Sequence, residues 1–338
     1  MKLYAGIDLH STNNYVGIID EEDRRVFKQK LSNTLGSVLV SLEPFKEELI
    51  GVVVESTFNW YWLVDGLMKH GYKIHLANPS AIRQYEGLKY VDDTWDSFWL
   101  AHMLRLNILP EGYIYPKEER PLRDLLRKRV RLVRERTAHI LSLESMVQRN
   151  LGLQISSNEV KKLQEADVEK LFDQPHLIMA AKSSVAIMRF LTGHIDAIER
   201  EVKSHLKLRE PFKCLISVPG IGDILGLTIM IEVGDIKRFA KVGDYSSYCR
   251  CVRTQRLSNG KSKGKGNSKN GNKYLAWAYV EAANMAIRYC PSARKFYQRK
   301  KQKEGSVVAI KALANKLARA TYYLMRDQVT YDPKKLFG

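Results

Sequence analysis

Acidic residues recur at the ends of apolar segments in the first hundred positions, and this recurrence constrains the fold more than any other feature. Asp8 closes the first strand-like run, and Glu55 closes the apolar run at 50–54. Asp93 and Asp96 are three residues apart, so they would share one face of a helix that begins there. Carboxylates that converge on one edge of a sheet supply the oxygen ligands that Mg²⁺ prefers. We therefore expect these four acids to form a Mg²⁺ site.

The segments around these acids follow an order that predicts a fold. The residue patterns predict three strands, at 2–8, 14–20 and 25–30, followed by a helix at 37–48. A strand at 50–54, a helix after the Ser56-Thr57 cap and a strand at 73–77 follow in that order. This βββαβαβ order matches the ribonuclease-H-like fold, in which the first and fourth strands are neighbours. Asp8 and Glu55 would then lie side by side. The alternative is that all four acids are ordinary turn and first-turn residues, with Asp92 or Asp93 as the helix cap.

The net charge of the chain indicates what kind of molecule it binds. The chain has 338 residues, 55 Lys+Arg against 37 Asp+Glu, and a formal net charge of +18. Such a surplus is typical of proteins that bind nucleic acid. A membrane surface is the rival partner, but no apolar run approaches the roughly 20 residues of a membrane span, and the N-terminus has no signal-peptide pattern. The four cysteines do not resemble a disulfide framework, although Cys249-Arg-Cys251 could be half of a zinc site. A reducing cytoplasm is expected.

Two long amphipathic helices are predicted in the middle of the chain. Residues 121–150 carry an apolar stripe beside a basic stripe of Arg123, Arg127, Arg131 and Arg134. Arginine binds phosphate through two parallel hydrogen bonds, so the basic stripe is interpreted as a nucleic-acid contact, against the alternative of a solvated face. The second helix, at about 183–208, has apolar residues at spacings of three and four, which is typical of coiled coils. The two helices could pair within one chain or between chains.

Two segments of the last third suggest contacts with phosphate. Residues 214–232 have the pattern of a helix-hairpin-helix, in which the turn at Gly220 and Gly222 leaves backbone N–H groups free at a helix start. Residues 252–274 then hold seven Lys or Arg and no acid. A basic, glycine-containing loop of this kind can clamp a nucleic-acid backbone. The candidate basic residues of the loop are Arg253, Arg256, Lys261, Lys263, Lys265 and Lys269.

These residues resemble those of a known family over nearly the whole chain. The stretch Asp93-Thr-Trp-Asp-Ser-Phe-Trp-Leu-Ala101 is similar to the Asp-x-x-Asp-Ala-x-x-Leu-Ala of DEDD-type transposases of bacterial insertion sequences, the group that includes the Piv-like site-specific DNA invertases. Ser217-Val-Pro-Gly-Ile-Gly222 resembles the hairpin of that family. Ser258-Asn-Gly-Lys261 and Lys269-Asn-Gly-Asn-Lys-Tyr-Leu275 resemble its Ser-Gly-Gly-Lys and Lys-x-Gly-Asn-x-x-Leu stretches.

The resemblance implies an organisation in three parts. Residues 1–112 would be an α/β, RuvC-like (ribonuclease-H-like) catalytic domain, residues 113–209 a coiled-coil-like helical region, and residues 210–338 a mainly α-helical transposase domain with the helix-hairpin-helix and the serine. It implies that Asp8, Glu55, Asp93 and Asp96 bind Mg²⁺ and that Ser258 attacks DNA phosphate and holds a covalent intermediate. Asp92 is an alternative ligand to Asp93, and Ser262 and Ser268 are alternatives to Ser258.

The resemblance also implies partners and a location. The family places the acids and the serine on different subunits, so a homo-oligomer, a dimer or a tetramer, is expected. Many members are guided by a structured bridge RNA that pairs with donor and target DNA. We therefore expect DNA recombination and transposition in the bacterial cytoplasm, with nucleoid association during the reaction. The alternatives are a site-specific DNA invertase, a metal-dependent junction resolvase or nuclease that uses water instead of serine, and a basic binding protein with structural acids.

Overall fold

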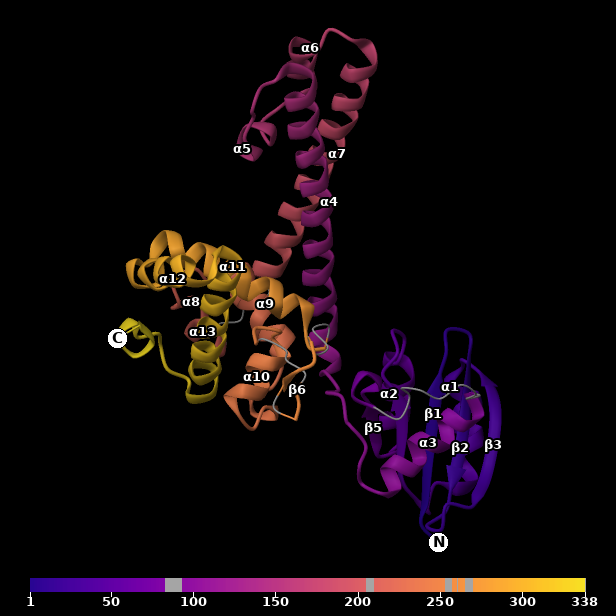
Figure 1. Ribbon diagram of the computed structural model, residues 1–338. Helices are drawn as coiled ribbons and strands as arrows, with labels where there is room; N and C mark the ends of the chain where they lie inside the picture. The colour runs from indigo at the N-terminus through magenta and orange to yellow at the C-terminus, as the bar shows by residue number, and fades with distance from the viewer. Residues whose placement is uncertain (83–92, 205–209, 253–256, 260, 265–269, 338) are drawn as a thin grey trace. The chain divides into compact units, whose positions relative to one another are not determined.

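The chain folds into two compact units. The computed structural model describes residues 1–82, 93–204, 210–252, 257–259, 261–264 and 270–337. Unit 1 comprises Met1–Lys117 and unit 2 comprises Glu118–Gly338. Each unit is described by itself, with the elements labelled as in Figure 1. The expected division of the second unit near residue 209 stays a prediction.

Unit 1 is a five-stranded mixed sheet with helices on both faces. Its elements are β1 (Leu3–Leu9), β2 (Asn13–Ile19), β3 (Arg25–Ser32), α1 (Leu35–Leu42), η1 (Glu43–Phe45), β4 (Leu49–Glu55), α2 (Tyr61–Lys69), β5 (Ile74–Ala77), η2 (Pro79–Ala81) and α3 (Asp93–Arg105). The strand order is β3-β2-β1-β4-β5. Strands β1, β2 and β3 form an antiparallel meander, whereas β4 runs parallel to β1 and to β5. The mixed α/β fold predicted from the sequence is confirmed, including the pairing of the first and fourth strands.

Alternation along β1 assigns its two faces. Leu3, Ala5, Ile7 and Leu9 join the buried cluster that contains residues of α1 and α2, such as Val38 and Leu63. The intervening residues face α3: Tyr4 packs with Phe98, and Gly6 lies under Ser97. Because successive side chains of a strand point to opposite faces, Asp8 belongs to the α3 face.

Glycines allow α3 to lie directly on the sheet. A Cβ at Gly6 would stand 1.9 Å from the Ser97 carbonyl oxygen, and one at Gly17 would stand 2.7 Å from Ser97 Oγ. Gly6 and Gly17 are register partners on β1 and β2. Any side chain here would push the helix away, so the glycine pair sets the distance between helix and sheet.

Two local expectations in unit 1 were wrong. The helix expected at 37–48 spans Leu35–Leu42 and gives way to the 3-10 turn η1, which has proline in its first turn. Ser56-Thr57 does not cap α2, which begins at Tyr61 after Trp60 without a side-chain cap. The Thr57 hydroxyl instead donates to Asn59 Oδ1 at 2.9 Å.

Unit 2 is almost entirely helical in its described residues. Its elements are η4 (Lys117–Glu119, at the junction), α4 (Arg120–Leu151), α5 (Ser157–Val160), α6 (Glu165–Leu171), α7 (Pro175–Ser204), α8 (Glu210–Ile216), α9 (Asp223–Val233), η5 (Ile236–Arg238), α10 (Val242–Tyr248), β6 (Leu257–Ser258), β7 (Lys261–Ser262), α11 (Lys273–Tyr289), α12 (Pro291–Glu304), α13 (Ser306–Asp327) and α14 (Pro333–Phe337).

The two long helices pair within one chain. Figure 1 shows α4 and α7 side by side over most of their length. Leu126 shares a buried cluster with Val202, Leu132 with Ile195, and Val147 with Ala181, so the two helices run antiparallel. Helix α7 begins at Pro175, eight residues before the predicted start, because a proline fits the first helical turn.

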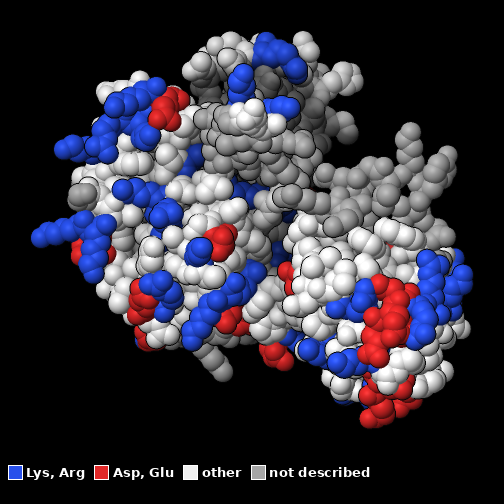
Figure 2. All heavy atoms as spheres, turned by 60° about the horizontal axis from the view of Figure 1, so that its bottom comes forward, with Lys and Arg blue, Asp and Glu red and all other residues white. Residues whose placement is uncertain are grey.

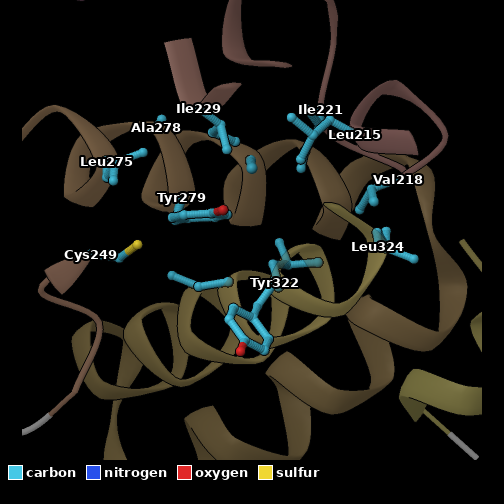
Figure 3. Packing of buried hydrophobic residues seen from close by; sticks show 14 of the residues in the cluster. Leu215, Val218, Ile221, Ile229, Cys249, Leu275, Ala278, Tyr279, Tyr322 and Leu324 are labelled. Atoms are coloured by element: carbon cyan, nitrogen blue, oxygen red, sulfur yellow. The ribbon is translucent and has the colours of Figure 1, made fainter. Parts of the chain in front are cut away.

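A second core fills the C-terminal part of unit 2. Helices α8 to α11 and α13 contribute the cluster shown in Figure 3, with Tyr279 and Tyr322 among its buried residues. The hydroxyls of Tyr279 and Thr321 hydrogen-bond at 2.6 Å, and Tyr322 donates to the Phe239 carbonyl at 3.0 Å. Internal partners of this kind let tyrosines occupy a dry core. This core is the base from which the serine-containing loop leaves and to which it returns.

Candidate functional site

Asp8 and Glu55 are brought together by the pairing of β1 with β4. The parallel register places Ile7 beside Val54, and the next residues are Asp8 and Glu55. Val53 packs with Leu100 of α3, so alternation puts Glu55 on the α3 face, as it does Asp8. The two carboxyl groups therefore share one edge of the sheet, as predicted.

Asp8 and Glu55 are two acids that share one poorly solvated environment. Asp8 is 3% exposed. Burial, a hydrogen bond with Asp8 and the charge of Asp8 raise the pKa of Glu55 to about 7, and the charge of His10 opposes the rise. Two carboxylates this close cannot both stay charged without a proton or a cation between them. The donor set, carboxylate oxygens at the rim of a buried pair, fits a hard divalent cation.

His10 is a member of the site that the sequence prediction missed. Its Nε2 lies 3.1 Å from Asp8 Oδ2. Its carbonyl accepts hydrogen bonds from Asn33 Nδ2 at 2.9 Å and Asn59 Nδ2 at 3.0 Å, which fix the backbone after β1. The available signal was its place two residues after Asp8, on the same face of the extended chain.

The N-terminal end of α3 points to the same edge. At its other end, His102 and Arg105 contact Asp23, which lies in the turn after β2 and thus at the amino end of β1. Helix α3 therefore runs antiparallel to β1, and Asp96, in its first turn, lies toward the end of the strand that carries Asp8.

The complete tetrad stays a prediction. The backbone of Asp93 begins α3, but its side chain and all of Asp92 lie outside the described residues, so the choice between them is open. Within the residues that the structure describes, no group of three or more His, Cys, Asp or Glu side chains is arranged to hold a metal ion. The structure thus establishes the Asp8–Glu55 pair and the direction of α3.

Ser258 lies in a short hairpin of unit 2. It pairs with Lys261 across β6 and β7, and Asn259 in the turn has a φ of 50°. Asn-Gly is the sequence that tight hairpin turns favour, because both turn positions need a positive φ. The side chains of Ser258 and Lys261 are exposed.

Arg123 and Arg127 have a partner that the basic-stripe interpretation did not foresee. Arg123 Nε lies 3.1 Å from Glu232 Oε2, and Arg127 Nη2 lies 2.8 Å from the same atom. Arg123 is 7% exposed and Glu232 is 1% exposed. The two arginines therefore have a structural role as counter-ions of a buried carboxylate. Their role as phosphate ligands stays a prediction.

The remaining basic candidates fall into three groups. Arg131 and Arg134 are exposed on α4, and Arg131 pairs with Glu135 one turn away at 2.9 Å. Lys261 and Lys263 are exposed in the hairpin. The others lie outside the described residues: Arg253, Arg256, Lys265 and Lys269. On the face shown in Figure 2, Lys and Arg are spread widely, with Asp and Glu in smaller groups among them.

The predicted helix-hairpin-helix turn joins α8 to α9. Gly220 has a φ of 99°, and a Cβ there would meet the Ala282 carbonyl oxygen of α11 at 2.4 Å. Gly222 stands at the N-terminus of α9 with open space around its Cα. An open cavity of about 560 Å³ borders this turn, with Lys203 and Tyr289 in its lining. Gly220 is thus required for packing, whereas Gly222 is free to approach a ligand.

The cysteines are free thiols, and Cys249 is fully buried while Cys251 is partly so. Across the described ranges, no helix is both long enough and apolar enough to cross a membrane.

Two family models match the chain. A transposase model for the DEDD transposases of the IS110 group matches residues 5–150. The model of the transposase IS116/IS110/IS902 family matches residues 212–298. The first match spans the sheet, α3 and most of α4, and the second spans the turn at Gly220 and the serine hairpin.

Relatives cover most of the chain at low identity. The transposase for insertion sequence element IS1328 of Yersinia enterocolitica is 26% identical over 94% of this chain and 95% of its own length. A probable family 20 transposase of Pseudomonas aeruginosa is 24% identical over 81% and 82%. The transposase for element IS1111A of Coxiella burnetii is 27% identical over 63% and 61%. Together with the two family matches, these relationships show that the chain belongs to the DEDD-type transposases of insertion sequences, which are enzymes that act on DNA.

Proposed function

We propose that this transposase cuts and rejoins DNA with a divalent-cation site in unit 1 and a serine nucleophile in unit 2. The observation that carries the first half is the Asp8–Glu55 pair, in which burial and mutual repulsion raise the pKa of Glu55 to about 7. A binding protein gains nothing from acids near phosphate, because each would repel it. A cation-dependent enzyme needs them.

Asp8 and Glu55, with Asp96 and Asp93 from α3, would hold Mg²⁺. When bound, Mg²⁺ supplies positive charge that stabilises a pentavalent phosphorus and its leaving oxygen. The chain's own contribution is the fixed direction of the ligands, since β1 and β4 hold two of them on adjacent strands. His10 keeps Asp8 oriented through the Nε2–Oδ2 contact.

Ser258 would form the covalent intermediate. Its Oγ loses a proton and attacks a DNA phosphorus, so one O–P bond forms while the bond from phosphorus to a deoxyribose oxygen breaks. The released deoxyribose hydroxyl takes up a proton, and attack of a second DNA hydroxyl on the phosphoserine reverses the step. Lys261, opposite Ser258 in the hairpin, places a positive charge where the alkoxide and phosphate develop negative charge.

We further propose a guide RNA and a homo-oligomer. The net charge of +18 exceeds what solubility requires, and the exposed basic residues of α4 and the hairpin suit a phosphate backbone. If one subunit supplied the acids and another supplied the serine to the same active site, this would explain why the two sets of residues belong to separate compact units.

The alternative is a metal-dependent nuclease or resolvase. The Asp8–Glu55 pair favours it as well, because the pair could activate water without Ser258. The decisive experiment traps the adduct. The protein, copurified with its RNA and supplied with Mg²⁺, is mixed with nicked element-end DNA and denatured. We expect a DNA–protein adduct at Ser258 that Ser258→Ala abolishes and Ser262→Ala, on the partner strand, retains. Cleavage without any adduct would establish the nuclease instead.

A further inference from the structure

Glu232 is a buried acid in unit 2 that the proposed reaction does not use. It lies in the last turn of α9, where the helix dipole disfavours a negative charge. Burial alone would raise the pKa of Glu232, but hydrogen bonding from Arg127 and the charges of Arg123 and Arg127 hold it below the ordinary value. The carboxylate is therefore charged and tied to α4, although a burial this deep is costly without a specific arrangement.

Asn272 connects this carboxylate to the serine loop. Its Nδ2 donates to Glu232 Oε2 at 2.7 Å. Its Oδ1 accepts from the backbone N–H groups of Tyr274 and Leu275, at 2.8 and 3.2 Å, and so caps α11. Asn272 is 7% exposed, so these hydrogen bonds are made inside the protein. The Asn272 side chain thus caps the N-terminus of α11 and also hydrogen-bonds to Glu232.

The two ends of the serine loop meet at the same place. The backbone N–H of Asn272 donates to the Tyr248 carbonyl at 2.6 Å. Arg250 Nε donates to the Gly271 carbonyl at 3.0 Å. Gly271 has a φ of 94°, and a Cβ there would stand 2.4 Å from the Tyr248 carbonyl oxygen. The chain therefore leaves after Arg250 and returns at Gly271 through a closed neck.

Arg127 adds a second contact to the returning end. Its guanidinium lies 4.5 Å from the centroid of the Tyr274 ring, two residues after the neck. Arg127 therefore holds Glu232 with its nitrogens and the first turn of α11 with its face. Helices α4, α9 and α11 converge on this one cluster.

We propose that Glu232 and Asn272, held by Arg123 and Arg127, are positioning residues for the loop that carries Ser258. This rests on the proposed role of Ser258 as the nucleophile. The cluster does not touch DNA. It fixes the two ends of the loop relative to the core of unit 2.

The test is an exchange of hydrogen-bond roles. Glu232→Gln removes the charge, and Asn272→Asp replaces the donor by a second carboxylate while keeping an oxygen to cap α11. In the double variant Glu232→Gln/Asn272→Asp, the new amide can donate to the new carboxylate, and the total charge is that of the natural protein. The matched control is Glu199→Gln, which removes the partner of Arg129 between α4 and α7, away from the neck.

Two readouts separate positioning from mere stability. The first is the rate of adduct formation at Ser258, measured below the unfolding transition, with nucleic-acid binding measured in parallel. The second is hydrogen exchange of peptides that cover the neck. We expect each single variant to form adduct on the order of 10–100-fold more slowly, with faster exchange at the neck and nearly unchanged binding. The double variant should recover in part on both readouts, because its new amide nitrogen donates to the new carboxylate but cannot accept from Arg123 and Arg127. Glu199→Gln should alter neither readout.

The outcomes distinguish the two proposals. If Ser258→Ala still forms the adduct, the proposed nucleophile is wrong whatever Glu232 does. If Ser258→Ala abolishes the adduct but both single variants keep the natural rate and neck exchange, the positioning role is overturned. If a single variant does not fold, Asn272→Ser, which keeps a capping oxygen but lacks the donor to Glu232, replaces it. Natural adduct rate and neck exchange in Asn272→Ser would equally overturn the role.

Discussion

Gly6 and Gly17 face each other across β1 and β2, and Ser97 of α3 rests on both, with its carbonyl oxygen over Gly6 and its Oγ over Gly17. This contact fixes the height of the helix that carries Asp93 and Asp96 above the strand that carries Asp8. The geometry of the acidic site therefore depends on two positions that carry no functional group.

Gly6→Ala should destabilise unit 1 by about 3 kcal/mol or more, because the new methyl group would overlap the Ser97 carbonyl oxygen, which is backbone and cannot move aside. Urea unfolding monitored by tryptophan fluorescence measures the loss. Gly36→Ala in α1 is the control, since open space surrounds Gly36, and it should be neutral or slightly stabilising. Equal stability of the two variants would contradict the close contact of α3 with the sheet.

The stability of unit 1 should fall between about pH 5 and pH 8 without divalent cations. The folded-state pKa of Glu55, about 7, lies above its ordinary value of 4.5. The contribution of this carboxyl is therefore fully present below pH 4.5 and is lost as the pH rises through 7. At roughly 1.4 kcal/mol per pH unit the upper bound is about 3 kcal/mol, which partial solvent exposure reduces. Unfolding midpoints across this range measure the effect, and Asp8→Asn should flatten it.

Divalent cations should reverse that loss. If Mg²⁺ binds the charged form of the Asp8–Glu55 pair, as proposed, it stabilises the folded state at pH 8 and releases a proton from Glu55. Thermal unfolding with and without millimolar Mg²⁺ tests this, and chelation should return the midpoint to its starting value. Asp8→Asn should lose the response. A shift of the same size in Asp8→Asn would assign Mg²⁺ binding to another place.

Gly220→Ala and Gly222→Ala should have opposite consequences. The first adds a methyl group at a φ of 99° and against the Ala282 carbonyl oxygen, so it should destabilise unit 2 by about 3 kcal/mol. The second adds a methyl group in open space and should fold normally. If the turn binds phosphate through its N–H groups, Gly222→Ala weakens DNA binding without lowering the unfolding temperature. Unchanged binding would leave the turn a structural element.

Arg131→Ala combined with Arg134→Ala should weaken nucleic-acid binding uniformly over sequences and lower the slope of log K against log salt by about 2, one for each lost phosphate contact. Both side chains are exposed, so the unfolding temperature should not change. Glu135→Gln is the control, because it releases Arg131 from its ion pair without removing positive charge. An unchanged salt slope in the double variant would make this face of α4 a solvated surface.

Much of unit 1 could be read from the sequence because its signals are local. Alternating apolar residues give the strands, and the order βββαβαβ makes β1 and β4 neighbours, which joins Asp8 to Glu55. The cap predicted for α2 came from a local capping rule, but the chain forms a turn at that place instead.

Local sequence patterns determined which elements form, which strands are neighbours in the sheet and which acids form a pair, because each of these depends on residues a few positions apart. The tertiary structure alone decided which partners the arginines of α4 contact. Glu232 lies 105 positions after Arg127, and no periodicity relates the two. Folding brings α9 against α4, and the cost of burying a carboxylate makes two arginines of the basic stripe its counter-ions.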